Sequence, residues 1–244
     1  MVLSPEGPSA LRAAERSGIN LYSERSLHDQ VKRLLAGPGD RIEAAVGGRV
    51  VDLLRSDGSV VEVQTRHLYA LLPKVRALAG AGIRVRVVHP VPASLEIRRR
   101  DPDSDRIVST RRSPKRGDLW SVFDELVKAP DLISLPGVAV EVLLVRASEV
   151  RVRDGTGSWR KRGDRTEDRF LEGIVGAASW ESPEDWLALI PRDLPEPWSS
   201  ETLGRSLGIA PARARKVLYS LARAGFLREE GRAGRRKLYR NADS

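Results

Sequence analysis

The segment 49–66, RVVDLLRSDGSVVEVQTR, predicts two β-strands joined by a tight turn. Its central Asp-Gly pair is a strong hairpin signal, because both positions of such a turn can take positive φ. Side chains alternate between the two faces of a strand, so Asp52 lies on one face of the first strand, while Glu62 and Gln64 share one face of the second. If the strands pair through the turn, the carboxylates of Asp52 and Glu62 come close on the same side. We expect each to raise the pKa of the other unless a positive charge lies between them.

A divalent cation is the simplest positive partner for this pair of carboxylates. Mg²⁺ and Mn²⁺ prefer oxygen ligands, and such an ion could polarise a phosphodiester. The residues leave a second interpretation open, in which the hairpin is an edge ribbon. Asp52 and Glu62 then face water and pair with neighbouring arginines such as Arg55.

The residues on either side of the hairpin predict a mixed α/β unit. Apolar side chains at helical spacing predict a helix within residues 23–37. Residues 41–66 divide at glycine-containing turns into three short strands. Residues 66–82 predict a helix that Pro73 either kinks or restarts, and residues 83–89 predict a further strand. The expected order is therefore αβββαβ.

This order, with Asp in the middle of the second strand and Glu-x-Gln in the third, resembles the PD-(D/E)XK nuclease superfamily, which has the restriction-endonuclease-like fold. The resemblance covers about residues 23–90. It implies that Asp52 and Glu62 bind the metal ion, with Glu24 of the first helix as a further ligand. Gln64 occupies the position of the usual lysine, and its neutral amide supplies neither the charge nor the proton chemistry of an amine. Some active restriction enzymes of this fold also use Glu-x-Gln.

The three histidines differ in how close they come to this predicted site. His28 lies one helical turn after Glu24, so the two side chains share a face. It could position water or contact phosphate, or it is a half-buried residue of the helix surface. His67 and His89 are expected to have capping, packing or structural roles.

The middle of the chain, residues 93–180, predicts a β-rich basic extension. We expect a hairpin over 93–116, an amphipathic helix over 117–129, a long strand that begins near Val138 and a basic loop over 153–169. The basic side chains could follow a phosphate backbone, with Trp159 stacking on a base; the alternative is a set of solvated loops. The candidate phosphate contacts are Arg98, Arg99, Arg100, Arg111, Arg112, Lys115, Arg160, Lys161 and Arg162.

The end of the chain, residues 198–244, has the order of a winged helix-turn-helix: a helix, a turn at Gly208, a second helix and two strands. In that geometry the second helix enters the major groove and flanking cations pair with phosphates. A purely structural or dimerising role is the alternative. The candidate DNA contacts are Arg213, Arg215, Lys216, Arg235, Arg236 and Lys237.

The composition agrees with a nucleic-acid partner. The 244 residues include 42 Lys and Arg against 33 Asp and Glu, a net charge of +9, which favours polyanions. The sequence has no Cys, which excludes disulfides, thiolate zinc sites and a Cys nucleophile. No stretch approaches the length of a membrane span and the first residues lack the apolar region of a secretion signal, so we expect a cytoplasmic protein with no membrane contact.

Together these features predict an α/β protein with a restriction-endonuclease-like core and a small winged helix-turn-helix domain. The expected divisions are an N-terminal arm over 1–20, a nuclease-like domain over 21–180, a linker over 181–197 and the winged helix over 198–244.

The function that we expect is metal-dependent cleavage of DNA with Mg²⁺ or Mn²⁺. Its expected partners are duplex DNA and a second subunit or copy. A non-catalytic DNA-binding protein or regulator on the same scaffold is the alternative. A protein- or RNA-interaction module of a defence or mobile-element system is a further one.

Overall fold

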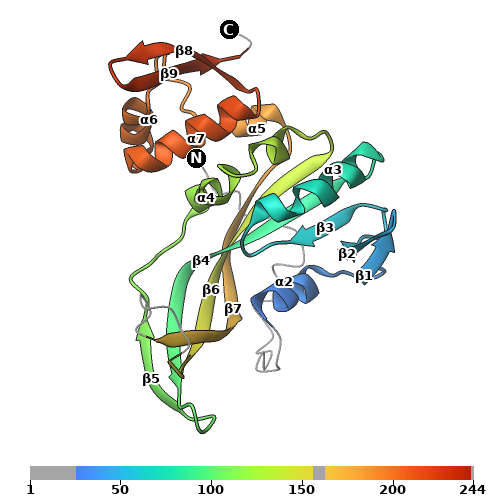
Figure 1. Cartoon of the computed structure of the whole chain (residues 1–244). Coiled ribbons are helices and arrows are strands. Elements are labelled where there is room, and N and C mark those ends of the chain that lie inside the picture. The colour runs from blue at the N-terminus through green and yellow to red at the C-terminus, as the bar shows by residue number, and fades with distance from the viewer. Residues whose placement is uncertain (1–25, 156–162, 243–244) are drawn as a thin grey trace.

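A seven-stranded mixed β-sheet forms the body of the protein (Figure 1). The computed structural model describes residues 26–155 and 163–242, so the predictions for the N-terminal arm over 1–20 and for Glu24, Trp159, Arg160, Lys161 and Arg162 lie outside the described residues. The strands are β1 (Arg41–Val46), β2 (Arg49–Leu54), β3 (Val60–Val63), β4 (Val85–Arg100), β5 (Ile107–Arg112), β6 (Val138–Arg153) and β7 (Asp164–Trp180).

The sheet order is β1-β2-β3-β4-β6-β7, and β5 pairs with the far half of β4. Neighbours in the first three strands are antiparallel. β4 is parallel to β3 on one side and to β6 on the other, whereas β6 and β7 are antiparallel. The parallel step from β3 to β4 requires a crossover, which the chain makes through a helix.

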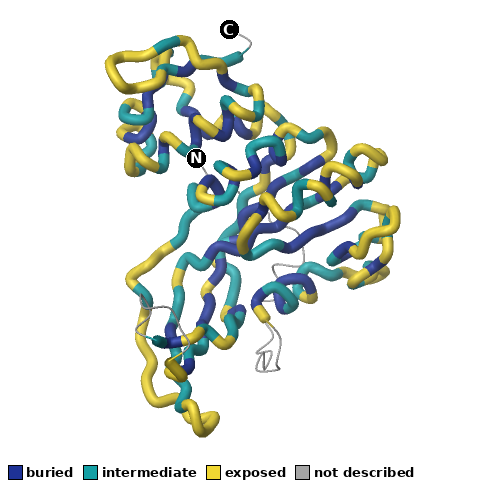
Figure 2. Tube along the Cα trace, in the orientation of Figure 1, coloured by how far each residue is buried: buried dark blue, intermediate teal, exposed yellow. Residues whose placement is uncertain are grey.

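Helices cover both faces of this sheet. The helices are α2 (Leu27–Leu35), α3 (Leu72–Gly80), α4 (Phe123–Leu126), α5 (Pro183–Leu187), α6 (Ser200–Leu207) and α7 (Pro211–Arg223), with 3-10 turns at Leu68–Leu71, Leu119–Val122 and Pro130–Ser134. Buried side chains of α2 pack with one set of strand residues, and those of α3, α4 and α5 pack with the other. Figure 2 shows the buried residues concentrated along the central strands.

The expected order αβββαβ is confirmed by α2, β1, β2, β3, α3 and β4. Pro73 lies in the first turn of α3, so it starts a helix after a 3-10 turn instead of kinking one. That position suits proline because the first N–H groups of a helix have no partner within the helix. The two turns of the three-stranded part also lie where glycine was expected, with positive φ at Gly47, Gly48 and Gly58.

β4 is longer than the strand predicted over 83–89, because it continues through Pro90 and Pro92 to Arg100. The carbonyls of Val88 and Pro92 accept hydrogen bonds from Gln64 N and Gly117 N, on the edge of β4 that faces away from β6. Backbone groups of residues 88, 90 and 92 therefore point to that edge. β3 ends before this point and β5 begins after it. Proline has no backbone N–H, and at these two positions no neighbouring strand is present to accept a hydrogen bond from one.

Two further segments differ from the sequence prediction. β7 includes residues 164–169, which were expected in a loop, and pairs with β6 over almost its whole length. The helix expected over 117–129 is a 3-10 turn followed by the four-residue α4. In the predicted linker, α5 forms and Trp186 is fully buried against the core.

The C-terminal region consists of α6, α7 and a hairpin of β8 (Leu227–Ala233) and β9 (Arg236–Asn241). This confirms the predicted order of two helices and two strands. Its buried side chains belong to the same apolar cluster as α3 and α4, and α7 packs against α4. The region lies at one end of the molecule, and the arm of β4 and β5 lies at the other (Figure 1).

A search of the described residues finds no helix that is both long enough and apolar enough to cross a membrane.

Candidate functional site

The side chains of Asp52 and Glu62 each reach the backbone of the other strand where β2 and β3 separate. The two strands pair only at Leu53 with Val61 and at Leu54 with Val60. Beyond that point, Asp52 N donates a hydrogen bond to Glu62 Oε1 at 3.4 Å, and Val63 N donates one to Asp52 Oδ2 at 2.8 Å. The side-chain oxygens therefore accept from N–H groups that the opened ladder leaves without a carbonyl.

Lys74 of α3 lies directly on Glu62, with 2.6 Å between Nζ and Oε1. Glu62 is only 2% exposed. Burial raises the pKa of the Glu62 carboxyl; the nearby Asp52 raises it further, and Lys74 acts in the opposite direction. A lysine thus supplies a positive charge in direct contact with one carboxylate of the pair, Glu62.

His28 of α2 contacts the other carboxylate, with 3.2 Å between Nε2 and Asp52 Oδ2. This hydrogen bond raises the pKa of His28, against the opposing effect of burial. For Asp52 burial works against ionisation, yet the hydrogen bonds from His28 and Val63 N lower its pKa. The imidazole is about one-third exposed, so it can still reach a ligand.

A second lysine, Lys32 of α2, lies buried near the same end of the sheet. Its ammonium contacts Glu43 at 2.7 Å and Asp29 at 3.3 Å, and only 4% of its side chain is exposed. Burial alone would lower the pKa of Lys32, but the Glu43 and Asp29 carboxylates, with a contribution from Asp52, raise it. Lys32 therefore adds a fixed positive charge beside the two carboxylates.

Gln64, at the position of the lysine in the resembled family, has its side-chain contact with the backbone and not with either carboxylate. Its amide reaches the carbonyl of His67 at 3.5 Å. The backbone carbonyl of Gln64 forms a hydrogen bond with Nδ1 of His89 at 2.7 Å. Burial lowers the pKa of His89, which keeps that ring neutral, and His67 starts the 3-10 turn before α3 with positive φ. His89 thus holds the local backbone, whereas the His67 ring makes no capping hydrogen bond and packs edge-on against Tyr69.

The described residues include no group of three or more His, Cys, Asp or Glu side chains placed to hold a metal ion. Glu24, the third ligand implied by the resemblance, lies outside them. Mg²⁺ in proteins commonly binds one or two carboxylates together with water and substrate phosphate. Asp52 and Glu62 supply such a donor set, so the residues present fit this ion.

The three consecutive arginines 98–100, expected as phosphate contacts, all pair with carboxylates of the sheet. The partners are Glu96 and Glu172 for Arg98, Asp164 for Arg99, and Glu167 for Arg100. Their charges are therefore largely compensated within the protein.

Arg111, Arg112 and Lys115 differ from that run. β5 is exposed along its whole length, and Lys115 follows it on the surface. None of the three has an ion-pair partner among the described residues. They remain accessible to an anionic partner.

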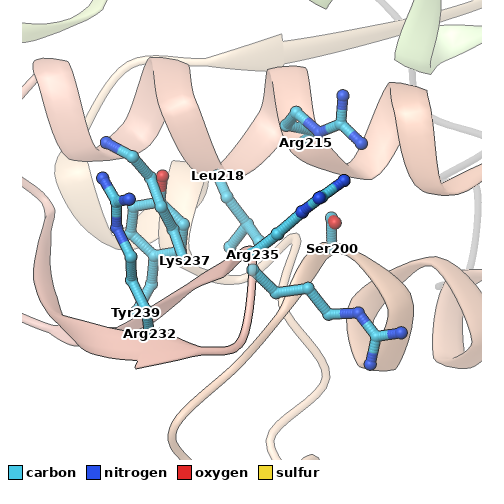
Figure 3. Close-up of a pocket in the computed structure, with 8 residues that line it drawn as sticks. Ser200, Arg215, Leu218, Arg232, Arg235, Lys237 and Tyr239 are labelled. Atoms are coloured by element: carbon cyan, nitrogen blue, oxygen red, sulfur yellow. The ribbon is translucent and has the colours of Figure 1, made fainter.

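The basic side chains of α7 divide between two faces of the helix. Arg213 pairs with Asp118 at 2.8 Å and Lys216 with Asp124 at 2.6 Å, so both point toward the body of the protein. Arg215 points instead to the β8–β9 hairpin, where it lines one pocket with Arg235, Arg236 and Lys237. Figure 3 shows this arrangement.

Lys74 and Lys32 are the site residues that the sequence interpretation missed. Lys74 lies in the first turn of the helix that follows the Glu-x-Gln strand, and this position is the signal that could have identified it. Its direction depends on how α3 crosses β3, which the residue pattern does not define.

The protein has recognisable relatives. A protein from Treponema pallidum (strain Nichols), described as "Uncharacterized protein", is 29% identical over 224 residues, which cover 91% of this chain and 87% of that relative. No solved structure gives a significant match. The family model described as "Domain of unknown function (DUF8091)" matches residues 25–181, which include the whole sheet and the residues at the candidate site. The chain therefore belongs to the DUF8091 family.

Proposed function

We propose that this protein is a metal-dependent DNA endonuclease with a restriction-endonuclease-like core and a C-terminal winged helix-turn-helix. One observation carries the proposal: Asp52 and Glu62 converge at the opened end of the β2–β3 hairpin, with Lys74 2.6 Å from Glu62. Two carboxylates and one amine at a strand end form a chemical set suited to phosphodiester hydrolysis.

The order of elements supports the same fold. A helix, an antiparallel three-stranded unit and a crossover helix that leads to a parallel fourth strand are the parts that the resemblance implies. Two helices and a hairpin at the C-terminus correspond to the parts of a winged helix.

In this proposal Asp52 and Glu62 hold Mg²⁺ or Mn²⁺. The ion would supply polarisation of the scissile phosphodiester. Lys74 provides the amine that Gln64 lacks, from α3 instead of from β3, and its charge stabilises negative charge at the reacting phosphate. The Glu62 carboxylate orients the Lys74 ammonium through their direct contact.

His28 is assigned a contact with the phosphate. Its pKa is raised by Asp52, and about one-third of its side chain is open to solvent. When protonated, the imidazole has a second N–H, at Nδ1, that donates a hydrogen bond to a phosphate oxygen while Nε2 stays bonded to Asp52.

Cleavage of supercoiled plasmid in Mg²⁺ or Mn²⁺ tests the proposal. Asp52→Asn and Glu62→Gln remove each charge with little change of shape, and each is expected to reduce nicking by at least about a hundredfold. Asp57→Asn is the matched control, because Asp57 is an exposed carboxylate on the same hairpin. Absence of metal-dependent nicking by the unmodified protein, or nicking that both site variants retain, would overturn the endonuclease assignment.

The role of Lys74 needs a separate pair of variants. Lys74→Met removes the amine and is expected to lower the cleavage rate about a hundredfold, whereas Lys74→Arg keeps a positive charge and retains more activity. Equal rates for Lys74→Met and the unmodified protein would assign Lys74 to structure alone. Thermal unfolding of both variants checks that the loss is not a loss of fold.

A non-catalytic DNA-binding protein on the same scaffold is the second candidate. The observation in its favour is that the Gln64 amide contacts a backbone carbonyl, while the buried Glu62 already has a partner in Lys74. That function predicts duplex binding that is unchanged by Asp52→Asn, and no cleavage in either metal.

A further inference from the structure

A pocket of about 380 Å³ lies in the C-terminal region between α7 and the β8–β9 hairpin. Five cationic side chains line it: Arg215 from α7 and Arg232, Arg235, Arg236 and Lys237 from the hairpin. Figure 3 shows Arg215 on the helix facing Arg235, with Lys237 and Arg232 on the neighbouring strands. The pocket brings together cations from positions about 20 residues apart, which the sequence shows only as separate runs.

Acidic side chains balance only part of this charge. Glu201 pairs with Arg236 at 2.8 Å, and Glu229 pairs with Lys237 at 2.7 Å and more loosely with Arg232 at 3.9 Å. Five cations thus face two carboxylates. Arg215 and Arg235 have no ion-pair partner among the described residues. Like charges gathered in this way repel each other, so an anion that enters the pocket stabilises it.

The opposite face of α7 packs against the body of the protein. The ion pairs Arg213–Asp118 and Lys216–Asp124 hold that face near α4, where α7 packs. A helix fixed in this way has less free surface for the floor of a major groove. Of the α7 cations expected to contact DNA, Arg213 and Lys216 are thus occupied, whereas Arg215 lies at the pocket.

The chemistry of the lining favours phosphate over a base edge. Guanidinium groups bind phosphate oxygens in a bidentate manner, and the hydroxyl of Ser200, at the start of α6, adds a donor. The lining includes no Asn, Gln, Asp or Glu that could read a base. A single phosphate carries at most about two negative charges, fewer than the net charge of +3 that five cations and two carboxylates leave at the pocket, so consecutive phosphates of one strand fit better than a free ion.

We infer that this pocket grips the sugar-phosphate backbone of DNA independently of sequence, and that the C-terminal region acts as a backbone clamp instead of a major-groove reader. The inference rests on the proposed action on DNA but does not require cleavage. It assigns Arg215 and Arg235 as the principal contacts, because their charges are uncompensated.

Duplex binding by the full chain in EDTA tests the inference, since cleavage cannot occur there. Fluorescence anisotropy with a labelled duplex gives the Kd at several salt concentrations. Arg215→Gln with Arg235→Gln is expected to weaken binding roughly tenfold or more and to reduce the slope of log K against log salt by about two. Arg215→Lys with Arg235→Lys keeps the charge and should restore most of the slope.

Arg205→Gln with Arg223→Gln is the matched control. Both arginines are exposed on α6 and α7 outside the pocket, and the change removes the same net charge from the same region. It should weaken binding by less than about threefold. Equal losses in the control and the pocket variant would overturn the pocket and leave only a general charge effect.

Two further measurements complete the test. Duplexes of equal length and shuffled sequence should have Kd values within about threefold, and a large preference that depends on Arg215 would overturn the claim of sequence independence. Inorganic phosphate should displace the duplex no better than sodium chloride of equal ionic strength; specific displacement would show a pocket for single phosphates and overturn the strand assignment.

The outcome of the binding experiment is independent of the outcome of the cleavage experiment. A protein that cuts plasmid but binds duplex equally well without Arg215 and Arg235 refutes the pocket alone. A protein that binds through the pocket and cuts nothing refutes the endonuclease alone.

Discussion

Two groups of arginines behave in opposite ways in this molecule. Arg98–Arg100 are consecutive in the sequence, and each is paired with a carboxylate of the sheet. Arg215 and Arg235 are distant in the sequence, come together at one pocket and have no ion-pair partner among the described residues. The dense run is the compensated one, and the dispersed pair is the one left for a ligand.

The difference shows that charge density along a chain is a poor guide to charge on the surface. In β4, β6 and β7 acidic and basic side chains pair between neighbouring strands, as Glu149 does with Arg169, and across β6, as Arg99 of β4 does with Asp164 of β7. In the C-terminal region the hairpin brings cations opposite α7 with fewer matching acids. Paired charges should therefore affect mainly stability, and unpaired ones mainly binding.

Glu149→Gln is expected to give the largest effect on stability. Glu149 is fully buried in the sheet and accepts from Arg151 at 2.7 Å and Arg169 at 2.6 Å. Breaking a buried pair leaves the remaining charges uncompensated, so the free energy of unfolding should fall by about 3 kcal/mol. Urea unfolding measures it. Glu184→Gln, at an exposed carboxylate, should change it by less than about 0.5 kcal/mol.

The same carboxylate gives this difference a defined pH dependence. Burial opposes ionisation of Glu149, but hydrogen bonds from Arg151 and Arg169 lower its pKa from 4.5 to about 2. A lowered pKa in the folded state stabilises above the unfolded value, and the contribution disappears as the pH falls toward about 2. The difference in the free energy of unfolding between the unmodified protein and Glu149→Gln should therefore become smaller as the pH falls from 5 to 2. A gap that widens on acidification would contradict the pairing.

Arg99→Gln tests the compensated run directly. Its partner Asp164 is buried and also pairs with Arg153, so part of the interaction remains. The expected loss is about 1–2 kcal/mol in the free energy of unfolding, with duplex affinity unchanged. A variant with normal stability but weakened duplex binding would reverse the assignment of this run.

The pair His28–Asp52 lies between the buried, paired charges of the sheet and the unpaired charges of the pocket, because it is partly exposed. The pKa of His28 is raised by Asp52, so the pair stabilises fully below the unfolded pKa near 6.5 and loses its effect as the pH rises through the folded value. His28→Gln should therefore lower the free energy of unfolding more at pH 5.5 than at pH 8.5. The difference between the two losses should be less than about 1 kcal/mol. Urea unfolding at both pH values measures this, and a cost that grows with pH would be inconsistent with the pair.

Arg112→Gln should have the smallest effect on stability. Arg112 is exposed on β5 and has no ion-pair partner among the described residues, so the free energy of unfolding should change by less than about 0.5 kcal/mol. If β5 contacts phosphate, the salt dependence of duplex binding should become shallower by about one. An unchanged slope would place β5 outside the DNA contact.

The sequence predicts the first half of the fold well because its signals are local. Apolar spacing identifies α2, and glycine turns separate β1, β2 and β3. The carboxylates Asp52 and Glu62 follow from strand alternation and the hairpin turn, and the structure brings them together.

The missed features all depend on contacts between elements. Lys74 reaches Glu62 only because α3 crosses β3 at that residue. β4 passes through Pro90 and Pro92 only because β3 has already ended. The compensation of Arg98–Arg100 depends on the register of β7, which the sequence interpretation left as a loop at its start.

The prolines of β4 have a consequence for self-association. The notch between the end of β3 and the start of β5 leaves a stretch of strand edge that another chain could extend. Pro90 and Pro92 remove two donors from this stretch, and Gly117 approaches so closely that a side chain there would collide with Val91 and with the carbonyl of Pro92. Addition of a foreign strand at this stretch of β4 is thus disfavoured by the missing donors and by the close approach of Gly117.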